Sequence, residues 1–226
     1  MRLSVVIPVL DEAATIGPAL EALAPLRHDG AQLIVVDGGS RDGTPDLARP
    51  FADRVIAAPR GRAAQMNAGA AIAMGGVLLF LHADTRLPVG ADRAIADALA
   101  GGALWGRFDV SIPGGAAFEL IAAMMNLRSR ITGIATGDQA LFVHRDIFKA
   151  VGGFPPIALM EDVALSAKLR RLARPACLRT RVTTSGRRWQ QHGIASTMLL
   201  MWWLRLAYFF GADPASLARR YGYVPR

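Results

Sequence analysis

The first half of the chain alternates between short apolar runs and stretches in which apolar residues recur at helical spacing. The runs are rich in β-branched and large apolar residues, and they lie at residues 3–9, 33–37, 54–57 and 77–81. Continuous short runs of this kind are typical of strands buried on both faces of a sheet. The stretches between them, such as 16–26 and the alanine-rich 64–73, favour helices.

Strand and helix in alternation predict right-handed βαβ units, so we expect the α/β class. The sheet should be Rossmann-like, central and mostly parallel, with helices on both faces. Beyond residue 100 the pattern predicts more elements in the same layers: strands at 105–110, 140–143 and 179–184, and helices at 116–130 and 161–171. With no repeat and no low-complexity linker, the pattern indicates a single domain.

Polar clusters stand where three of the predicted strands end. Asp11-Glu12 follows the first strand, Asp37-Gly38-Gly39-Ser40 the second, and His82-Ala83-Asp84-Thr85 the fourth. Parallel α/β sheets bind ligands at the carboxyl ends of their strands, which would bring these acidic clusters together at one edge. Asp37, in a glycine-dense turn, suits hydrogen bonds to a ribose or a base.

A basic loop precedes the alanine-rich helix. Arg60 and Arg62 lie before or at the predicted helix start, and Asn67 follows on the helix itself. Guanidinium groups and free backbone N–H groups at such a place suit a diphosphate, although a solvated basic turn has the same pattern.

Asp84 is the candidate metal ligand, because a carboxylate after a buried strand can hold Mg²⁺ or Mn²⁺ beside phosphate oxygens and water. His82 allows three interpretations: a metal ligand, a hydrogen-bond partner of the donor, which we favour, or a plain strand-end residue.

Glu161 and Asp162 open the predicted helix after the turn Gly-Gly-Phe-Pro. Two carboxylates at a helix start are often there only because they interact favourably with the helix dipole. One of them is also placed to act as a general base on an acceptor hydroxyl. Their position alone favours the structural interpretation.

The charge and composition of the chain limit the kinds of ligand and the compartment that we expect for it. The 226-residue chain carries a formal net charge of +8 and one cysteine, Cys177. Its arginines are scattered and few aromatics lie near them, so we expect phosphate-bearing ligands or an anionic membrane surface and no nucleic acid. The single cysteine fits a reducing compartment, so we expect a cytoplasmic protein, with the inner face of the membrane as an alternative.

The C-terminal segment 198–210 is strongly apolar, contains Trp202, Trp203 and Arg205, and is too short for a bilayer span of about 20 residues. Residues 191–226 are therefore interpreted as an apolar helix and basic tail. Three roles stay open for this segment: packing on the domain, peripheral contact with a membrane, or a homodimer contact.

The motifs taken in order resemble family 2 glycosyltransferases. They are Val-Ile-Pro-Val-Leu-Asp-Glu, Val-Val-Asp-Gly-Gly-Ser-x-Asp-Gly-Thr, Arg-Gly-x-Ala-x-x-x-Asn-x-Gly, Leu-His-Ala-Asp-Thr and Glu-Asp, and the resemblance runs from about residue 3 to residue 190. It implies a GT-A fold over residues 1–190, a nucleoside diphosphate-sugar donor, and inversion at the anomeric carbon.

The resemblance also implies roles for individual residues. Asp84 matches the last aspartate of the Asp-x-Asp metal motif, with His82 in place of the first, and Asp162 matches the catalytic base, with Glu161 beside it. The motif matches assign these residues to the nucleotide-sugar: Pro8, Asp11, Glu12, Asp37, Gly38, Arg60, Arg62, Asn67, His82, Ala83, Asp138, Arg188 and Trp189.

Ser185-Gly-Arg-Arg-Trp189 resembles the Gln-x-x-Arg-Trp motif of processive members, but serine replaces the glutamine, which argues against a polymer synthase. We therefore expect an inverting transferase of hexosyl groups, assisted by Mn²⁺ or Mg²⁺, that moves a UDP-linked sugar to a lipid or small-metabolite hydroxyl. The alternatives are a nucleotidyltransferase acting on a sugar phosphate and an inactive GT-A-like binding module.

Overall fold

The predicted strands join in one sheet in the computed structural model, which describes residues 2–222 except for the side chains of Arg188, Gln190 and His192. The strand order is β3-β2-β1-β4-β7-β6-β8-β5. The strands are β1 (Leu3–Val9), β2 (Gln32–Asp37), β3 (Arg54–Ala57), β4 (Val77–Phe80), β5 (Thr85–Arg86), β6 (Trp105–Ser111), β7 (Phe142–His144) and β8 (Ala176–Thr184).

The sheet is mostly parallel. β3, β2, β1 and β4 run in parallel, β7 is antiparallel to β4 and β6, and β8 returns parallel to β6. The predicted strand at 140–143 begins later, at Phe142, because a 3₁₀ turn, η1 (Gly137–Gln139), precedes it and Ala140 has a left-handed φ of 47°.

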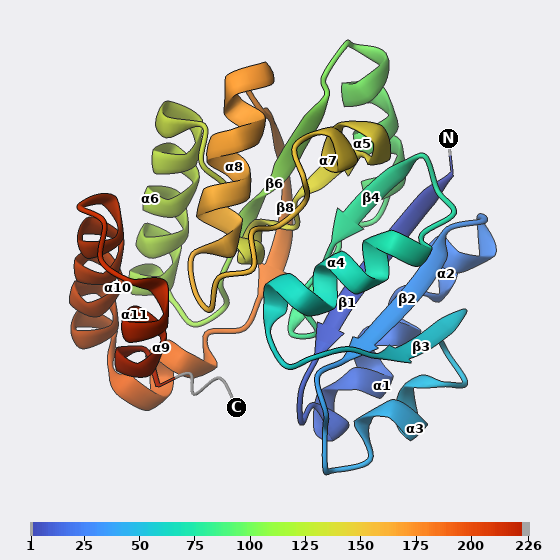
Figure 1. The fold of residues 1–226 in the computed structure, drawn as a ribbon, viewed down its shortest axis with the longest axis horizontal. Coiled ribbons are helices and arrows are strands. Elements are labelled where there is room, and N and C mark those ends of the chain that lie inside the picture. The colour runs from blue at the N-terminus through green and yellow to red at the C-terminus, as the bar shows by residue number, and fades with distance from the viewer. Residues whose placement is uncertain (1, 223–226) are drawn as a thin grey trace.

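Helices cover both faces of the sheet (Figure 1). They are α1 (Ala13–Glu21), α2 (Ala24–His28), α3 (Thr44–Ala48), α4 (Arg62–Ile72), α5 (Ala91–Ala100), α6 (Ala116–Thr132), α7 (Arg145–Ala150), α8 (Glu161–Leu172), α9 (Arg187–His192), α10 (Ile194–Phe209) and α11 (Pro214–Arg220).

Two large apolar clusters form the core, one on each side of the sheet. Side chains of α1, α5 and α6 contribute to one cluster, and side chains of α4, α7 and α8 to the other. The strands between them are buried on both faces: every residue of β2 and β4 is buried. The chain therefore folds as the single α/β domain with a sheet between helices that its pattern predicts.

The C-terminal helices form a smaller cluster of their own. Leu204 of α10 and Leu217 of α11 are buried against Leu159 and Met160, which precede α8. In Figure 1 these helices lie together beside α6 and α8, at the side of the molecule opposite β3. Within residues 2–222, no helix has the length and apolar character needed to cross a membrane.

The buried network around Arg107 fixes α6 on the sheet. Arg107 is fully buried on β6, pairs with Asp109, and donates hydrogen bonds to Ser129 Oγ and to the Asn126 carbonyl of α6. The Asn126 side chain in turn bonds both backbone groups of Val110. Because these hydrogen bonds and the ion pair with Asp109 satisfy the guanidinium, the charge of Arg107 is accommodated in the interior between β6 and α6.

Gly69 sets the distance between α4 and the sheet. A Cβ added at Gly69 would lie 2.4 Å from Val6 Cγ1 and 2.9 Å from Val36 Cγ2, so only glycine allows the helix to approach β1 and β2 this closely. That approach brings the N-terminus of α4 to the ends of both strands.

We expect Gly69→Ala to lower the free energy of unfolding by about 1–3 kcal/mol, because the added methyl group overpacks this interface. Urea unfolding followed by circular dichroism measures the change. Gly17→Ala is the matched control, since Gly17 also lies inside a helix but a Cβ there meets nothing within 4 Å. A Gly69→Ala protein as stable as the Gly17→Ala protein would contradict the close-packing argument.

Candidate active site

The carboxyl ends of β1 and β4 open into a cleft of about 440 Å³. Polar and aromatic side chains from distant parts of the sequence meet in it. Its lining includes Pro8, Glu12, Arg62, Gln65, His82, Ala83, Asp84, Asp138, Ser185, Arg187 and Trp189. Eight of these were assigned to the site from the sequence; Gln65, Ser185 and Arg187 were not.

Gln65 ties the two strand ends together. It is buried on α4, and its Nε2 donates hydrogen bonds of 2.8 Å to the carbonyl oxygens of Val9 and Val36. Its side chain lies where a Cβ on Gly38 would come within 3.0–3.1 Å of it, so glycine at 38 makes room for this bridge. Gly38, a predicted donor-binding residue, therefore has a packing role in the described structure.

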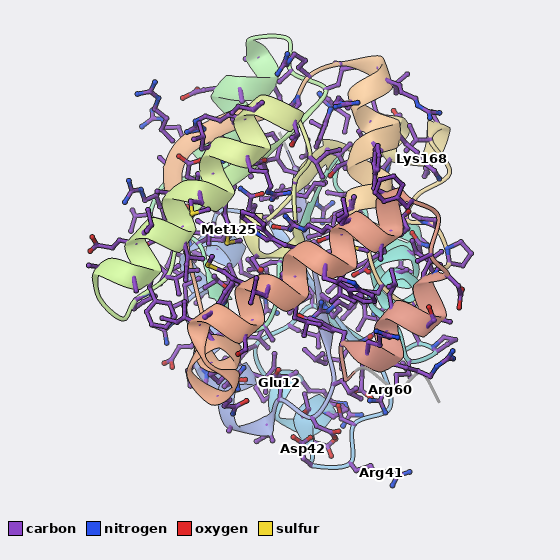
Figure 2. The ribbon with its side chains drawn as sticks, turned by 90° about the vertical axis from the view of Figure 1, so that its left-hand side faces the viewer. Glu12, Arg41, Asp42, Arg60, Met125 and Lys168 are labelled. Atoms are coloured by element: carbon purple, nitrogen blue, oxygen red, sulfur yellow. The ribbon has the colours of Figure 1, made fainter. Side chains whose placement is uncertain are left out.

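The loops after β1 and β2 exchange hydrogen bonds. Asp11 Oδ1 accepts from the Arg41 N–H, and Asp42 Oδ2 accepts from the Ala13 N–H, each at 2.8 Å. Figure 2 shows Asp42 and Arg41 together below Glu12, at this end of the molecule. These two hydrogen bonds fix the loop after β1, and with it Glu12, at the mouth of the cleft.

Two predicted donor-binding residues have their polar atoms occupied by the protein backbone. The Asp37 carboxylate accepts from the N–H groups of Gly39 and Ser40 in its own turn. The Asn67 side chain bonds the N–H and C=O of Phe154 at 3.0 and 2.8 Å.

Neither of those two residues, nor Asp11, Gly38 or Arg60, is among the residues that line the cleft. Their binding roles stay predictions. Arg188 also belongs to the predicted set, and its side chain lies outside the described part of the structure.

Asp84 stands among charges of both signs. Arg187 Nη2 lies 3.9 Å from Asp84 Oδ2 and 3.4 Å from Glu12 Oε2, so one guanidinium spans the two carboxylates. Partial burial raises the pKa of the Asp84 carboxyl, Asp138 and Glu12 act in the same direction, and His82 and Arg187 oppose them. A cation near Asp84 would relieve this concentration of negative charge.

Asp84 fits a metal site in which bound phosphate oxygens and water supply the remaining ligands. Among the described residues, no group of three or more His, Cys, Asp or Glu side chains converges in a way that would hold a metal by itself. Mg²⁺ and Mn²⁺ at phosphate sites commonly use one or two carboxylates, with the remaining positions taken by phosphate oxygens and water. Asp84 at the cleft wall is compatible with that type of site.

His82 is held against the turn that precedes β7. Its Nδ1 lies 3.5 Å from Asp138 Oδ1, and a Cβ on Gly137 would lie 2.3 Å from its Cε1. Although burial alone would raise the pKa of Asp138, the hydrogen bond and charge of His82, together with the charges of Arg62 and Arg205, outweigh it, and the pKa is lowered. His82 therefore acts as the partner of an ionised Asp138.

A second pocket of about 100 Å³ adjoins the cleft and shares Arg62, His82 and Asp138 with it. Asp162 lies in this pocket: its Oδ2 accepts from the Gly137 N–H at 2.8 Å, and its Oδ1 from the Val163 N–H at 2.7 Å. The turn at Gly137 thus connects the predicted base to His82 and the metal side of the cleft.

Glu161 is buried at the first turn of α8. Burial and the charge of Asp162 raise the pKa of Glu161 to about 7, while Arg62 opposes the shift. The preceding residue, Met160, has a left-handed φ of 68°, a conformation that costs a non-glycine residue of order 1–3 kcal/mol. That backbone turn directs both carboxylates into the pocket.

The raised pKa of Glu161 makes stability depend on pH. The unfolded chain releases this proton near pH 4.5 and the folded chain near 7, so the contribution of Glu161 to stability is full below 4.5 and is lost, at up to about 1.4 kcal/mol per pH unit, as the pH rises to 7. We expect Glu161→Gln to flatten this decline in urea unfolding measured across the range. Glu119→Gln, an exposed change on α6, should keep the wild-type slope; equal slopes in all three proteins would show that Glu161 is not the source.

The chain resembles known proteins in sequence over part of its length. The "PGL/p-HBAD biosynthesis glycosyltransferase" of Mycobacterium bovis (strain BCG / Pasteur 1173P2) is 38% identical over 91 residues, which are 37% of this chain and 36% of that protein. The matched segment is thus only about a third of this curated relative.

Solved structures share the fold. S. aureus TarS (1–349) superposes with a TM-score of 0.69 at 19% identity, over 82% of this chain and 60% of TarS. Glucosyl-3-phosphoglycerate synthase from Mycobacterium tuberculosis, in complex with Mn²⁺, UDP and phosphoglyceric acid, gives a TM-score of 0.61 at 20% identity, over 81% of this chain and 69% of the synthase. The expected GT-A architecture is therefore confirmed.

The family model described as "Glycosyl transferase family 2" matches residues 4–147, which run from β1 to α7 and include both strand-end loops, Asp84 and the turn at Gly137. On that match, the chain belongs to glycosyl transferase family 2.

Proposed function

We propose that this protein is an inverting glycosyltransferase that moves a sugar from a nucleoside diphosphate-sugar to an acceptor hydroxyl with the help of a divalent metal. The observation that carries the proposal is the turn at Gly137, which holds Asp162 on one side and His82 on the other. Asp84 and the base are thereby kept on two sides of one continuous cleft, as transfer between two substrates requires.

The donor occupies the larger cleft. Its nucleotide lies at the end of β1 near Pro8 and Glu12, and its diphosphate lies between Arg62 and Arg187. Guanidinium groups suit that position because they bond phosphate oxygens in pairs. We favour UDP as the nucleotide: TarS was solved with UDP-GlcNAc and the mycobacterial synthase with UDP, although a mannosyltransferase of the same fold was solved with GDP-Man.

Asp84 holds the metal. When bound, Mn²⁺ or Mg²⁺ supplies positive charge beside the departing diphosphate. Arg187 lies on the same side of the cleft and adds a second positive charge there. His82, fixed by Asp138, faces the donor and stays a hydrogen-bonding residue in this scheme.

Asp162 accepts the proton of the acceptor hydroxyl. As that proton leaves, the acceptor oxygen bonds to the anomeric carbon and the bond from this carbon to the diphosphate oxygen breaks on the opposite face, which inverts the configuration. The hydrogen bonds from Gly137 and Val163 orient the carboxylate for this step. Glu161 lies beside Asp162 and keeps the pocket charged when it is ionised.

We expect Asp162→Asn to lower the rate of nucleoside diphosphate release by about 10²-fold or more while UDP binding is retained. Asparagine keeps an oxygen for the Gly137 N–H but cannot take a proton. Release from UDP-sugar with water as acceptor and calorimetric binding of UDP measure the two effects. Asp97→Asn, an exposed change on α5, is the control; wild-type release by Asp162→Asn would make the base assignment wrong.

The metal role is tested by thermal shift. We expect UDP to raise the melting temperature of the wild type more in the presence of Mn²⁺ than in its absence, because bound ligand stabilises the native state. Asp84→Asn should lose the increment due to Mn²⁺, whereas Asp92→Asn, on α5 and away from the cleft, should keep it. An Asp84→Asn protein with the full Mn²⁺ increment would exclude Asp84 as the metal ligand.

A further inference from the structure

A third pocket, of about 190 Å³, lies between α6 and α10 and is not used by the donor scheme. Its lining is mostly apolar and rich in methionine, with Met124 and Met125 from α6 and Met198 from α10. Figure 2 looks onto this face, where Met125 lies between the two helices. Unbranched methionine side chains adapt to the shape of an apolar guest.

The pocket is continuous with the active site. Asp138 and Met201 each line all three spaces: this pocket, the donor cleft and the Asp162 pocket. Arg205 is shared with the Asp162 pocket. A molecule in the α6–α10 pocket therefore lies next to the pocket that contains Asp162.

Two guanidinium groups face this apolar space. Within the described part of the chain, Arg128 Nε and Nη2 are shielded from solvent and have no hydrogen-bond partner. Burial and the charge of Arg205 lower the pKa of Arg128 to about 10, although Asp162 and Asp138 oppose the shift. Unpaired buried cations are costly, and an anion between the two arginines would supply the missing acceptors.

The mouth of the pocket is apolar as well. On α6, Leu120, Met124, Leu127 and Ile131 form an exposed stripe at helical spacing, and on α10, Leu199, Trp202 and Leu206 form another. Met124 and Trp202 belong both to these stripes and to the pocket lining. An apolar chain longer than the pocket would continue over this surface rather than into water.

We propose that the α6–α10 pocket binds the acceptor, and that the acceptor is a single lipid-like molecule with an anionic group beside its reacting hydroxyl. The inference rests on the proposed glycosyl transfer and specifies its second substrate. Arg128 and Arg205 hold the anionic group, the methionines hold the apolar chain, and the hydroxyl points to Asp162.

Calorimetric titration of the full chain with three probes tests the apolar chain and the anionic group separately, with decyl phosphate kept below its micelle concentration and decanol below its solubility limit. Decyl phosphate carries both parts, decanol only the chain, and inorganic phosphate only the anion. We expect decyl phosphate to bind at least about tenfold more tightly than either of the others. If decanol or inorganic phosphate binds as tightly as decyl phosphate, the proposal is overturned.

Two variants locate the binding. Arg128→Gln and Trp202→Ser should each weaken decyl phosphate binding by roughly tenfold. Trp202 is 61% exposed, so its replacement leaves the core intact. Arg93→Gln on α5 removes an equal charge outside the pocket and should bind as the wild type does. Wild-type affinity in both pocket variants would show that the amphiphile binds elsewhere.

Titration of the wild type with UDP and Mn²⁺ separates this inference from the proposed function. If UDP binds but decyl phosphate does not, only the acceptor pocket is wrong. If decyl phosphate binds through Arg128 but UDP does not, the glycosyl-transfer proposal fails, and with it the assignment of the bound amphiphile as an acceptor.

Discussion

The geometry of the site depends on the absence of a side chain at Gly137. Its Cα lies against the His82 ring, so closely that a Cβ would overlap Cε1, while its N–H donates to Asp162. The next residue, Asp138, pairs with His82. One short turn therefore fixes the distance between the loop after β4, which carries Asp84, and α8, which carries Asp162. Any larger residue would have to displace one of them.

Sheet topology brings this turn into place. β7 is antiparallel to β4, and the turn precedes it, so Gly137 lies at the same edge of the sheet as the carboxyl end of β4. Gln139 accepts the Thr136 N–H and lies near Asn126, which is itself bonded to β6. Through Asn126, the buried Arg107 network therefore contacts both this turn and α6. The donor cleft, the Asp162 pocket and the α6–α10 pocket therefore share this turn through Asp138.

Much of this arrangement could be predicted from the sequence. Buried strands leave a clear apolar pattern, and polar clusters at their ends indicate the edge where Glu12 and Asp84 meet. The prediction of Asp162 as the catalytic base depends on the whole series of motifs, because a Glu-Asp pair alone does not distinguish a base from a helix start. These predictions depend on local pattern and chain order, which the sequence displays directly.

Contacts between distant residues could not be predicted. Nothing local indicates that Asn67 bonds Phe154, or that Gln65 joins two strand ends, because each partner lies far along the chain. The sequence pattern does not indicate Arg187 either, because only the folded chain brings its guanidinium to 3.9 Å from Asp84. The unpaired state of Arg128 follows only from the three-dimensional position of every nearby acceptor.

Helix α10 (Ile194–Phe209) has two different apolar faces, and packing on the domain accounts for only one of them. A helix with apolar residues around its whole circumference is expected to be buried on all sides. α10 is divided instead: Leu204 is buried against α11 and the residues before α8, whereas Trp202 and Leu206 on another face are exposed. The buried face explains packing on the domain and nothing more. The exposed face borders the pocket that contains Arg128 and Arg205, so its apolar character is best understood as part of a binding surface.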